Sequence, residues 1–397
     1  MLSAEWCANS FDHTSPELAQ NLHATLATMR ADHPVAWSEE HGGFWVVTRY
    51  EDVLRVAQDW RTFSSAQGVS VPGTKMVVRA IPEHLDPPLH REFKRLINAW
   101  FTPAVVAPYE APTRALVTRL IDGFVEAGTC EFMTAFARPF PGLAFFDLVL
   151  NAPPDEVHAI NEQATAASMP NNPNARDAWA HMYRWISELL EQRRHEPPKG
   201  DVVDAVLAAE IEGRPITDEE AIGVVQLLIL GGLDTTAGLL GQVMIRFCGE
   251  PGIPALLRRE PERIPDVVEE LLRLETSFVA IARTATCDTE IGGRKVREGD
   301  KVLIYWASAN RDEREFACPA DFDAGRASNR HLTFGAGPHR CAGSNLARMN
   351  IRIALEEVVA RLDDLRLATD EPIHFHSVLN RAPLGVPISF TPGPRLS

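Results

Sequence analysis

The 397-residue sequence is poor in cysteine and contains no CxxC pair. Because its six cysteines are scattered, we expect neither a disulfide framework nor a zinc site, and a reducing cytoplasm fits better. No apolar run approaches eighteen uninterrupted residues, so we expect no membrane-spanning helix. The N-terminus lacks a charged segment followed by an apolar one, so we expect no signal peptide and a cytoplasmic protein. The cysteines are Cys7, Cys130, Cys248, Cys287, Cys318 and Cys341.

Basic residues are also in short supply, with 39 lysines and arginines against 54 acidic residues and a net charge of −15. This balance argues against nucleic acid as a general partner. Internal repeats, low-complexity tracts and a clear linker are missing, so we expect residues 1–397 to form one domain. Hydrophobic residues make up 45% of the chain, which is ample for a large core.

The pattern of residue types predicts a mainly α fold with a minor β component. Helical patterns dominate between residues 90 and 275, and short β-like runs alternate with loops after residue 283. A strand-like run comes earlier, at residues 42–50. Residues 65–90 are rich in proline, glycine and serine, and a loop of that length in a compact protein is typically a binding element.

Residues 216–247 contain no proline and predict a long helix through the core. Thr217 and Glu220 form a T-x-x-E capping box at its start. Its centre reads Gly-Gly-Leu-Asp-Thr-Thr (231–236), and glycine weakens a helix by roughly 1 kcal/mol relative to alanine. The first threonine can bond back to the carbonyl of the first glycine, four residues earlier, which would open a local groove. The alternative is a glycine pair that packs at a helix crossing, with the acid at a solvated bend.

Two further motifs carry charge or a thiol. Glu270 and Arg273 form an i, i+3 pair on one predicted helix face, which taken alone is a common solvated ion pair. Residues 334–343 read FGAGPHRCAG and place Cys341 among glycines, just ahead of a helical stretch. Such glycines let backbone N–H groups approach the sulfur, and the positive end of the following helix stabilises a thiolate.

Together, and in this order, the motifs resemble those of the cytochrome P450 superfamily, specifically its soluble bacterial members. Residues 334–343 match the F-x-x-G-x-[RH]-x-C-x-G signature of haem-thiolate proteins, and residues 231–236 resemble the oxygen-binding motif of the long central helix. The Glu270–Arg273 pair resembles the E-x-x-R motif, and residues 85–90 (LDPPLH) resemble the start of the helix that meets the haem. The resemblance covers essentially the whole chain. It implies a P450 fold, with a long central helix over the haem and small β-sheets at the substrate side.

The resemblance implies haem b (iron protoporphyrin IX) with the Cys341 thiolate as axial iron ligand, an arrangement that favours O–O cleavage. It assigns the haem propionates to His90, Arg283 and His339. Where the family often has arginine four residues after the histidine, this sequence has Lys94, a point charge instead of a planar fork. We assign Lys94 to the propionates, with partner docking as the alternative. The remaining cofactor-binding residues expected from the signature are Phe334, Gly335 and Gly343.

The implied activity is that of a monooxygenase that inserts one atom of dioxygen into a C–H bond, by hydroxylation or O-dealkylation. The resemblance implies that Thr235 would stabilise the iron-bound hydroperoxide and that Asp234 would relay protons from solvent. The Glu270–Arg273 pair would be structural. The expected substrate is a small hydrophobic, aromatic or terpenoid molecule. The residues expected to line its pocket are Leu227, Leu230, Gly231, Phe278, Val279, Leu379 and Asn380.

The chain has no space for a fused flavin or iron–sulfur domain after Phe390, so we expect electrons from separate proteins. The resemblance implies a ferredoxin and its reductase, with NAD(P)H as the ultimate donor. The ferredoxin would bind a basic face around the cysteine loop, for which the candidates are Arg91, Arg95, Arg348 and Arg352. We expect a monomer that binds neither membrane nor nucleic acid.

Alternative functions come from different classes. One is a tailoring oxidase that acts on a larger natural product, and another is a haem-thiolate binding protein without catalysis. The intact Asp234–Thr235 pair argues against the second. It also argues against a peroxide-driven peroxygenase, because such members typically replace this pair and place an arginine in the helix. A helical scaffold without cofactor would be colourless when purified.

Overall fold

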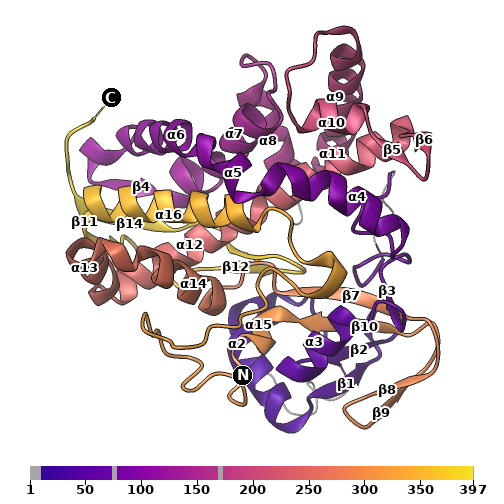
Figure 1. Ribbon diagram of the computed structural model, residues 1–397. Helices are drawn as coiled ribbons and strands as arrows, with labels where there is room; N and C mark the ends of the chain where they lie inside the picture. The colour runs from indigo at the N-terminus through magenta and orange to yellow at the C-terminus, as the bar shows by residue number, and fades with distance from the viewer. Residues whose placement is uncertain (1–9, 74–77, 169–172, 397) are drawn as a thin grey trace.

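The computed structural model describes residues 10–73, 78–168 and 173–396 (Figure 1). Cys7 and residues 74–77 of the predicted 65–90 loop lie outside these ranges. The fold is mainly helical with small sheets, as predicted. The α-helices are α2 (Pro16–Asp32), α3 (Tyr50–Gln58), α4 (Leu89–Asn98), α5 (Pro103–Val106), α6 (Glu110–Asp122), α7 (Pro139–Ala144), α8 (Val157–Ser168), α9 (Ala175–His195), α10 (Val202–Leu207), α11 (Asp218–Gly232), α12 (Asp234–Gly249), α13 (Gly252–Arg259), α14 (Ile264–Leu274), α15 (Trp306–Ala309) and α16 (Ser344–Arg361).

The strands join distant parts of the chain. They are β1 (Val35–Ser38), β2 (Phe44–Val47), β3 (Phe63–Ser64), β4 (Thr129–Glu131), β5 (Glu210–Ile211), β6 (Arg214–Pro215), β7 (Ala280–Ala285), β8 (Thr289–Ile291), β9 (Arg294–Val296), β10 (Lys301–Tyr305), β11 (Asp363–Leu367), β12 (Phe375–Ser377), β13 (Arg381–Pro383) and β14 (Pro387–Thr391). The five-stranded sheet has the order β1-β2-β10-β7-β3, and a three-stranded sheet has the order β11-β14-β4. In the larger sheet β2 and β10 run parallel, and the other neighbours run antiparallel.

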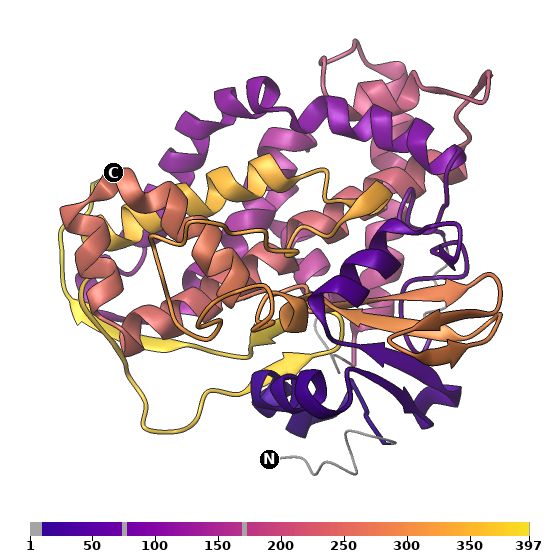
Figure 2. The same ribbon diagram turned by 60° about the horizontal axis from the view of Figure 1, so that its bottom comes forward.

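Two regions lie side by side in both ribbon views (Figures 1 and 2). The five-stranded sheet, with α2 and α3, occupies one end of the molecule, and most of the helices occupy the other. The largest cluster of buried side chains lies among the helices, and two smaller clusters cover the sheet. The predicted strand at residues 42–50 is confirmed only over Phe44–Val47, because α3 already begins at Tyr50.

The predicted long helix is divided into α11 and α12, which meet at Leu233. The capping box is confirmed: the Glu220 N–H donates to Thr217 Oγ1, and the Glu220 carboxylate accepts the Thr217 N–H. The stretch Asp218–Gly249 is long and apolar enough to cross a membrane by length and composition, yet 67% of its apolar window is buried inside the protein. Because α12 packs against both α7 and α16, this stretch serves as a core helix pair.

Candidate active site

The cysteine loop, residues 334–343, closes on itself directly before α16. The Cys341 N–H donates to the Phe334 carbonyl at 2.8 Å. Gly337 has a φ of 68°, a left-handed backbone that favours glycine. A Cβ at Gly337 would lie 2.6 Å from the Ala57 carbonyl oxygen, so glycine is what lets the loop pack on the end of α3. The loop is therefore held rigidly at the N-terminal end of α16.

Cys341 is a free cysteine and an exposed residue, in a loop whose residues are mostly half-buried, although many protein atoms surround its thiol. The Gly343 N–H hydrogen-bonds to its sulfur. Desolvation by the surrounding protein raises the pKa of the Cys341 thiol, while Lys94, the Gly343 N–H and Arg340 act to lower it. A metal cation at this sulfur would displace the proton outright. The loop thus presents a thiol that a metal converts to a thiolate.

Two basic residues from other segments, His90 and Arg283, meet His339 of the loop. The rings of His90 on α4 and His339 lie 4.2 Å apart, and Arg283 on β7 is buried close to both. Desolvation lowers all three pKa values, to about 4 for His90, about 2 for His339 and about 10 for Arg283. Among the described residues, neither ring nitrogen of buried His90 has a hydrogen-bond partner. Buried donors without partners are costly, and a bound carboxylate satisfies them, so the group fits the haem propionates.

Lys94 reaches the cysteine loop from α4. Its Nζ donates to the Arg340 carbonyl at 2.6 Å. Burial lowers the pKa of Lys94, and the negative charge of a Cys341 thiolate opposes that shift. The ammonium group is therefore held by the residue that precedes the cysteine. Its assignment to a propionate stays a prediction.

One face of α11, continued into the first turn of α12, is open while its neighbours are buried. The Thr235 hydroxyl donates to the Gly231 carbonyl at 3.1 Å, as predicted. Ser277 Oγ donates to the Thr235 carbonyl at 2.6 Å and so satisfies a backbone group at the helix break. A Cβ added at Gly231 would meet nothing within 4 Å, so this position borders open space. The exposed or half-buried positions from residue 227 to residue 235 are Leu227, Leu230, Gly231, Gly232, Asp234 and Thr235.

Glu270 and Arg273 form a buried ion pair, with 1% and 0% of their surfaces exposed. Arg273 donates to both carboxylate oxygens, at 2.9 and 2.7 Å. Its Nη1 also donates to the carbonyls of Asn310 and Pro319, at 2.9 and 2.7 Å. The interpretation as a solvated pair is therefore wrong, because segments that lie about forty residues further along the chain cover it.

The ion pair is connected to the cysteine loop through residues that the sequence motifs do not identify. The Asn310 side chain accepts the Leu332 N–H at 2.6 Å and donates to Thr333 Oγ1 at 2.8 Å. Arg326 makes a second ion pair with Glu270, at 3.1 Å. The polar run at residues 310–315, which includes Asn310, was a signal for part of this network, but the fold sets its partners.

A family model described as Cytochrome P450 matches residues 166–383. The probable cytochrome P450 127A1 of Sinorhizobium fredii is 36% identical over 374 residues, which cover 89% of this chain and 87% of that protein. The chain belongs to the cytochrome P450 family. Linalool 8-monooxygenase of Pseudomonas putida is 30% identical, over 90% of this chain and 93% of its own. The solved structure of CYP109Q5 from Chondromyces apiculatus has a TM-score of 0.88 and 30% identity, over 98% of this chain and 99% of that one.

The P450 is therefore a monooxygenase and a haem-iron enzyme. Membership of the family implies a haem-thiolate cofactor, dioxygen and redox partners. The cysteine loop and the basic group described above contain the residue types that such a cofactor needs, a thiol for the iron and cations for the carboxylates.

The residues expected to line the substrate pocket of this P450 differ in burial. Phe278 and Asn380 face each other across an isolated β-bridge, and both are half-buried. Leu379 is half-buried too, and its carbonyl accepts the Val279 N–H at 2.7 Å. Val279 itself is 0% exposed and packs in the cluster that joins α2 to the sheet. The expectation that its side chain lines the substrate pocket is therefore wrong, because that side chain is enclosed in this cluster just before β7.

The arginines expected to dock a ferredoxin fall into two groups. Arg348 pairs with Glu269 at 2.6 Å, and Arg352 pairs with Glu110 at 2.7 Å. These acids come from α14 and α6, so their approach to α16 was invisible in the sequence. Arg91 and Arg95 are exposed on α4. Arg348 and Arg352 are therefore largely neutralised.

The 65–90 loop contributes residues that sequence reasoning missed. Ser65 Oγ lies 3.3 Å from His339 Nε2, within hydrogen-bonding distance. Asp86 accepts the Ser65 N–H at 2.9 Å and also the Ser64 hydroxyl. The loop is thereby fastened to the basic group beside the cysteine loop. The sequence placed Asp86 in a family motif but did not show which residues it holds.

The two adjacent glycines of the P450 helix are expected to respond oppositely to alanine. A Cβ at Gly232 would lie 2.9 Å from the Phe145 ring, so Gly232→Ala should destabilise the protein by about 1–3 kcal/mol through overpacking. Gly231→Ala meets no atom within 4 Å and should leave stability unchanged or raise it by up to about 1 kcal/mol. Urea unfolding of the two variants measures the difference, and equal stabilities would contradict this packing.

Proposed function

We propose that this P450 holds haem b through the Cys341 thiolate and inserts one atom of dioxygen into a C–H bond of a small hydrophobic molecule. When bound, the haem-thiolate iron supplies the electron transfer and O–O cleavage that no side chain can provide. The free cysteine Cys341 supports the assignment on one side. Buried His90 and Arg283, together with half-buried His339, support it as the carboxylate cradle.

The observation that carries the proposed oxygen chemistry is the helix break between α11 and α12. The Thr235 hydroxyl is tied to the Gly231 carbonyl, at a position that borders open space. Because the Gly231 carbonyl takes the one hydroxyl hydrogen, the Thr235 oxygen has its lone pairs left to accept a hydrogen bond from a protonated group in that space. Asp234, the first residue of α12, is half-buried next to it and would pass protons in from solvent. A carboxyl group beside a hydroxyl group, at the break between two apolar helices, is therefore suited to proton delivery.

Thr235→Ala tests this role. The variant should still consume NAD(P)H and dioxygen, but product formed per electron should fall by about tenfold, with peroxide released instead. Removing a general acid typically lowers the rate roughly 100-fold or more. The expected loss is smaller here because a water molecule can replace the Thr235 hydroxyl. Thr235→Ser, which keeps the hydroxyl, should retain most of the coupling. Unchanged coupling in the alanine variant would remove Thr235 from the proposed chemistry.

The substrate class rests on the apolar character of the open helix face and its neighbours. Leu227, Leu230 and Leu379 are all half-buried and apolar, which suits a hydrophobic ligand. The relatives include linalool 8-monooxygenase, named above, and a steroid C26-monooxygenase of Mycobacterium tuberculosis that is 30% identical. A tailoring role on a larger natural product is the second candidate, since the P450 EryK, solved with erythromycin B, has a TM-score of 0.86 and 29% identity.

A spectral-shift screen on the ferric protein distinguishes these two classes. Small terpenoid and aromatic compounds should displace the water on iron and shift the haem absorption at micromolar concentrations. A response to macrocyclic or peptide natural products alone would replace the first candidate with the second.

We further propose that electrons come from a ferredoxin and its NAD(P)H-dependent reductase, and that the P450 acts as a cytoplasmic monomer. Arg91 and Arg95 on α4 and Arg340 on the cysteine loop are exposed, and the hydrogen bond from Lys94 to the Arg340 carbonyl joins α4 to the loop. Their charges would attract an acidic partner despite the net charge of −15. Reduction by an acidic ferredoxin should slow as salt is added, because exposed charges are screened.

A further inference from the structure

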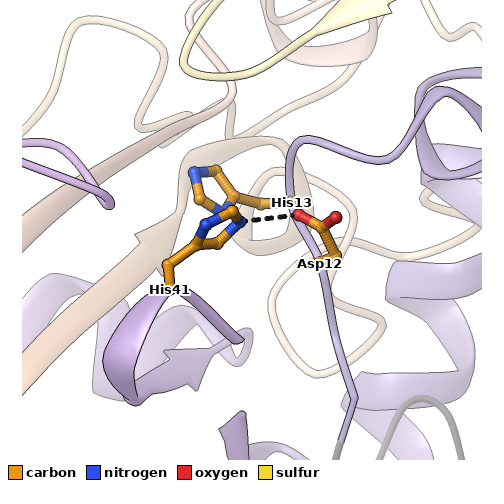
Figure 3. A group of neighbouring side chains, drawn as sticks. All are labelled: Asp12, His13 and His41. Atoms are coloured by element: carbon orange, nitrogen blue, oxygen red, sulfur yellow. Dashed lines mark hydrogen bonds and ion pairs between the residues drawn. The ribbon is translucent and has the colours of Figure 1, made fainter. Parts of the chain in front are cut away.

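A cluster of two histidines and one aspartate lies outside the site described above (Figure 3). Asp12 and His13 precede α2, and His41 lies in the short 3₁₀ helix η1 (Glu40–Gly42), between β1 and β2. His41 Nε2 lies 2.9 Å from Asp12 Oδ1. One potential ligand atom from each of the three side chains lies within 4.8 Å of the others. In the part of the chain that the structure describes, no other group of histidine, cysteine and carboxylate side chains meets this criterion.

His13 is the unusual member of the cluster. It is 0% exposed, and within the described ranges neither of its ring nitrogens has a hydrogen-bond partner of good geometry. Desolvation, aided by His41, lowers the pKa of His13 to about 4. The negative charge of Asp12 and a backbone contact with Val71 act to raise the pKa of His13. A buried imidazole with unsatisfied nitrogens is costly, and a bound metal ion would satisfy one of them.

The cluster is held in place from several sides. Ser38 Oγ donates to the Phe11 carbonyl at 2.8 Å and anchors the segment that precedes Asp12 to β1. Thr14 donates twice to Asp12 Oδ1, through its N–H at 2.9 Å and its hydroxyl at 2.7 Å. Burial opposes ionisation of Asp12, but these bonds and the one to His41 keep its pKa below the ordinary value. Metal ligands need this support to keep their orientation.

We propose that Asp12, His13 and His41 form a binding site for a divalent transition-metal ion of the zinc type. Two imidazoles and a carboxylate are ligands that Zn²⁺ binds well, and three protein ligands leave one position for water. Ligand atoms in a tetrahedral zinc site lie roughly 3.3 Å apart, from metal–ligand distances of about 2.0–2.1 Å. The side chains therefore need to move by about an ångström to reach this geometry.

The site adjoins a part of the long loop. A cleft of about 320 Å³ beside His41 is also lined by Ser70, Val71 and Pro72 of the 65–90 loop. The bound ion would tie the segment before α2 to the turn between β1 and β2 at the edge of this cleft. The scattered cysteines led us to expect no zinc site. That expectation does not apply to this cluster, because its three ligands include no cysteine.

Zinc binding to the haem-loaded protein tests the proposal. Wild-type protein freed of adventitious metal should bind one Zn²⁺ per chain with micromolar or tighter affinity in competition with a chromophoric chelator, and its Tm should rise. Excess Mg²⁺ or Ca²⁺ should not compete, because these ions prefer all-oxygen sites. X-ray absorption at the zinc edge should show nitrogen and oxygen ligands at about 2.0–2.1 Å.

His41→Asn is the decisive variant, because asparagine tolerates the φ of 54° at this position and the fold should persist. Removing a residue that only hydrogen-bonds to a metal ligand typically lowers metal affinity roughly 10–100-fold. Removing the His41 ligand itself should therefore lower Zn²⁺ affinity about 100-fold or more. Asp12→Asn should weaken binding similarly. His195→Ala, an exposed histidine on α9, should bind like the wild type. Equal binding by wild type and His41→Asn, no stoichiometric Zn²⁺, or sulfur ligands in the absorption spectrum would each overturn the proposal.

Discussion

Cys341→Ser should abolish the absorption band that thiolate-ligated haem shows when it is reduced and bound to carbon monoxide. A serine hydroxyl is a harder donor than sulfur and holds its proton far more tightly than a thiol, so it supplies no comparable charge to the iron. Turnover should fall to background, and haem content should drop. Absorption spectra and haem quantitation on purified protein measure both.

The matched control is Cys287→Ser, which changes an exposed free cysteine on the sheet side of the molecule. It should keep the thiolate-type band and full haem content. A Cys341→Ser protein with an unchanged band would mean that another group binds the iron. The loop geometry would then need a different explanation, although the family assignment would still stand on the comparisons.

Arg273→Ala should cost about 3–5 kcal/mol, the usual penalty when one partner of a buried ion pair is removed. Glu270 would keep only Arg326 and the Asn329 amide as side-chain partners, and the carbonyls of Asn310 and Pro319 would lose their donor. Proteins of this kind are stable by only about 5–15 kcal/mol, so expression and haem retention should both suffer. Arg273→Lys should recover little, because a single ammonium cannot reproduce the fork that contacts several acceptors.

Arg259→Ala provides the comparison, since Arg259 pairs with Glu260 at 2.7 Å on the surface. Exposed pairs contribute about 0–1 kcal/mol, so this variant should resemble the wild type. Urea unfolding followed by circular dichroism, together with haem absorbance, gives the two free energies of unfolding. If the two arginine variants lost equal stability, the buried network would not be what holds residues 310–326 against α14.

Several features of the site followed from short stretches of sequence. The Thr217–Glu220 capping box, the Thr235–Gly231 hydrogen bond and the glycine-rich loop before α16 depend on residues within a few positions of each other. Such contacts are dictated by backbone geometry and the chemistry of adjacent side chains, which the sequence displays directly. The glycine pair at positions 231 and 232 shows the limit of such local inference. Gly231 borders open space, as the groove interpretation expects, whereas Gly232 packs on Phe145, as the packing interpretation expects.

Contacts between distant segments could not be predicted in the same way. The sequence did not show that Glu269 and Glu110 neutralise the arginines of α16, or that Lys94 bonds to the Arg340 carbonyl. It also gave no sign that Val279 is enclosed by α2 and the sheet. The partners in each case are separated by tens to hundreds of residues.

By itself the sequence determined the family, the helical character and the identity of the cysteine loop, because each depends on local spacing. The tertiary structure decided which charges are buried, which are paired and which face open space. It brought Asp12 and His13 next to His41, and covered Glu270 and Arg273 with the segment that follows β10. The physical reason is that burial and desolvation depend on what packs around a group, and that is settled only when remote segments come together.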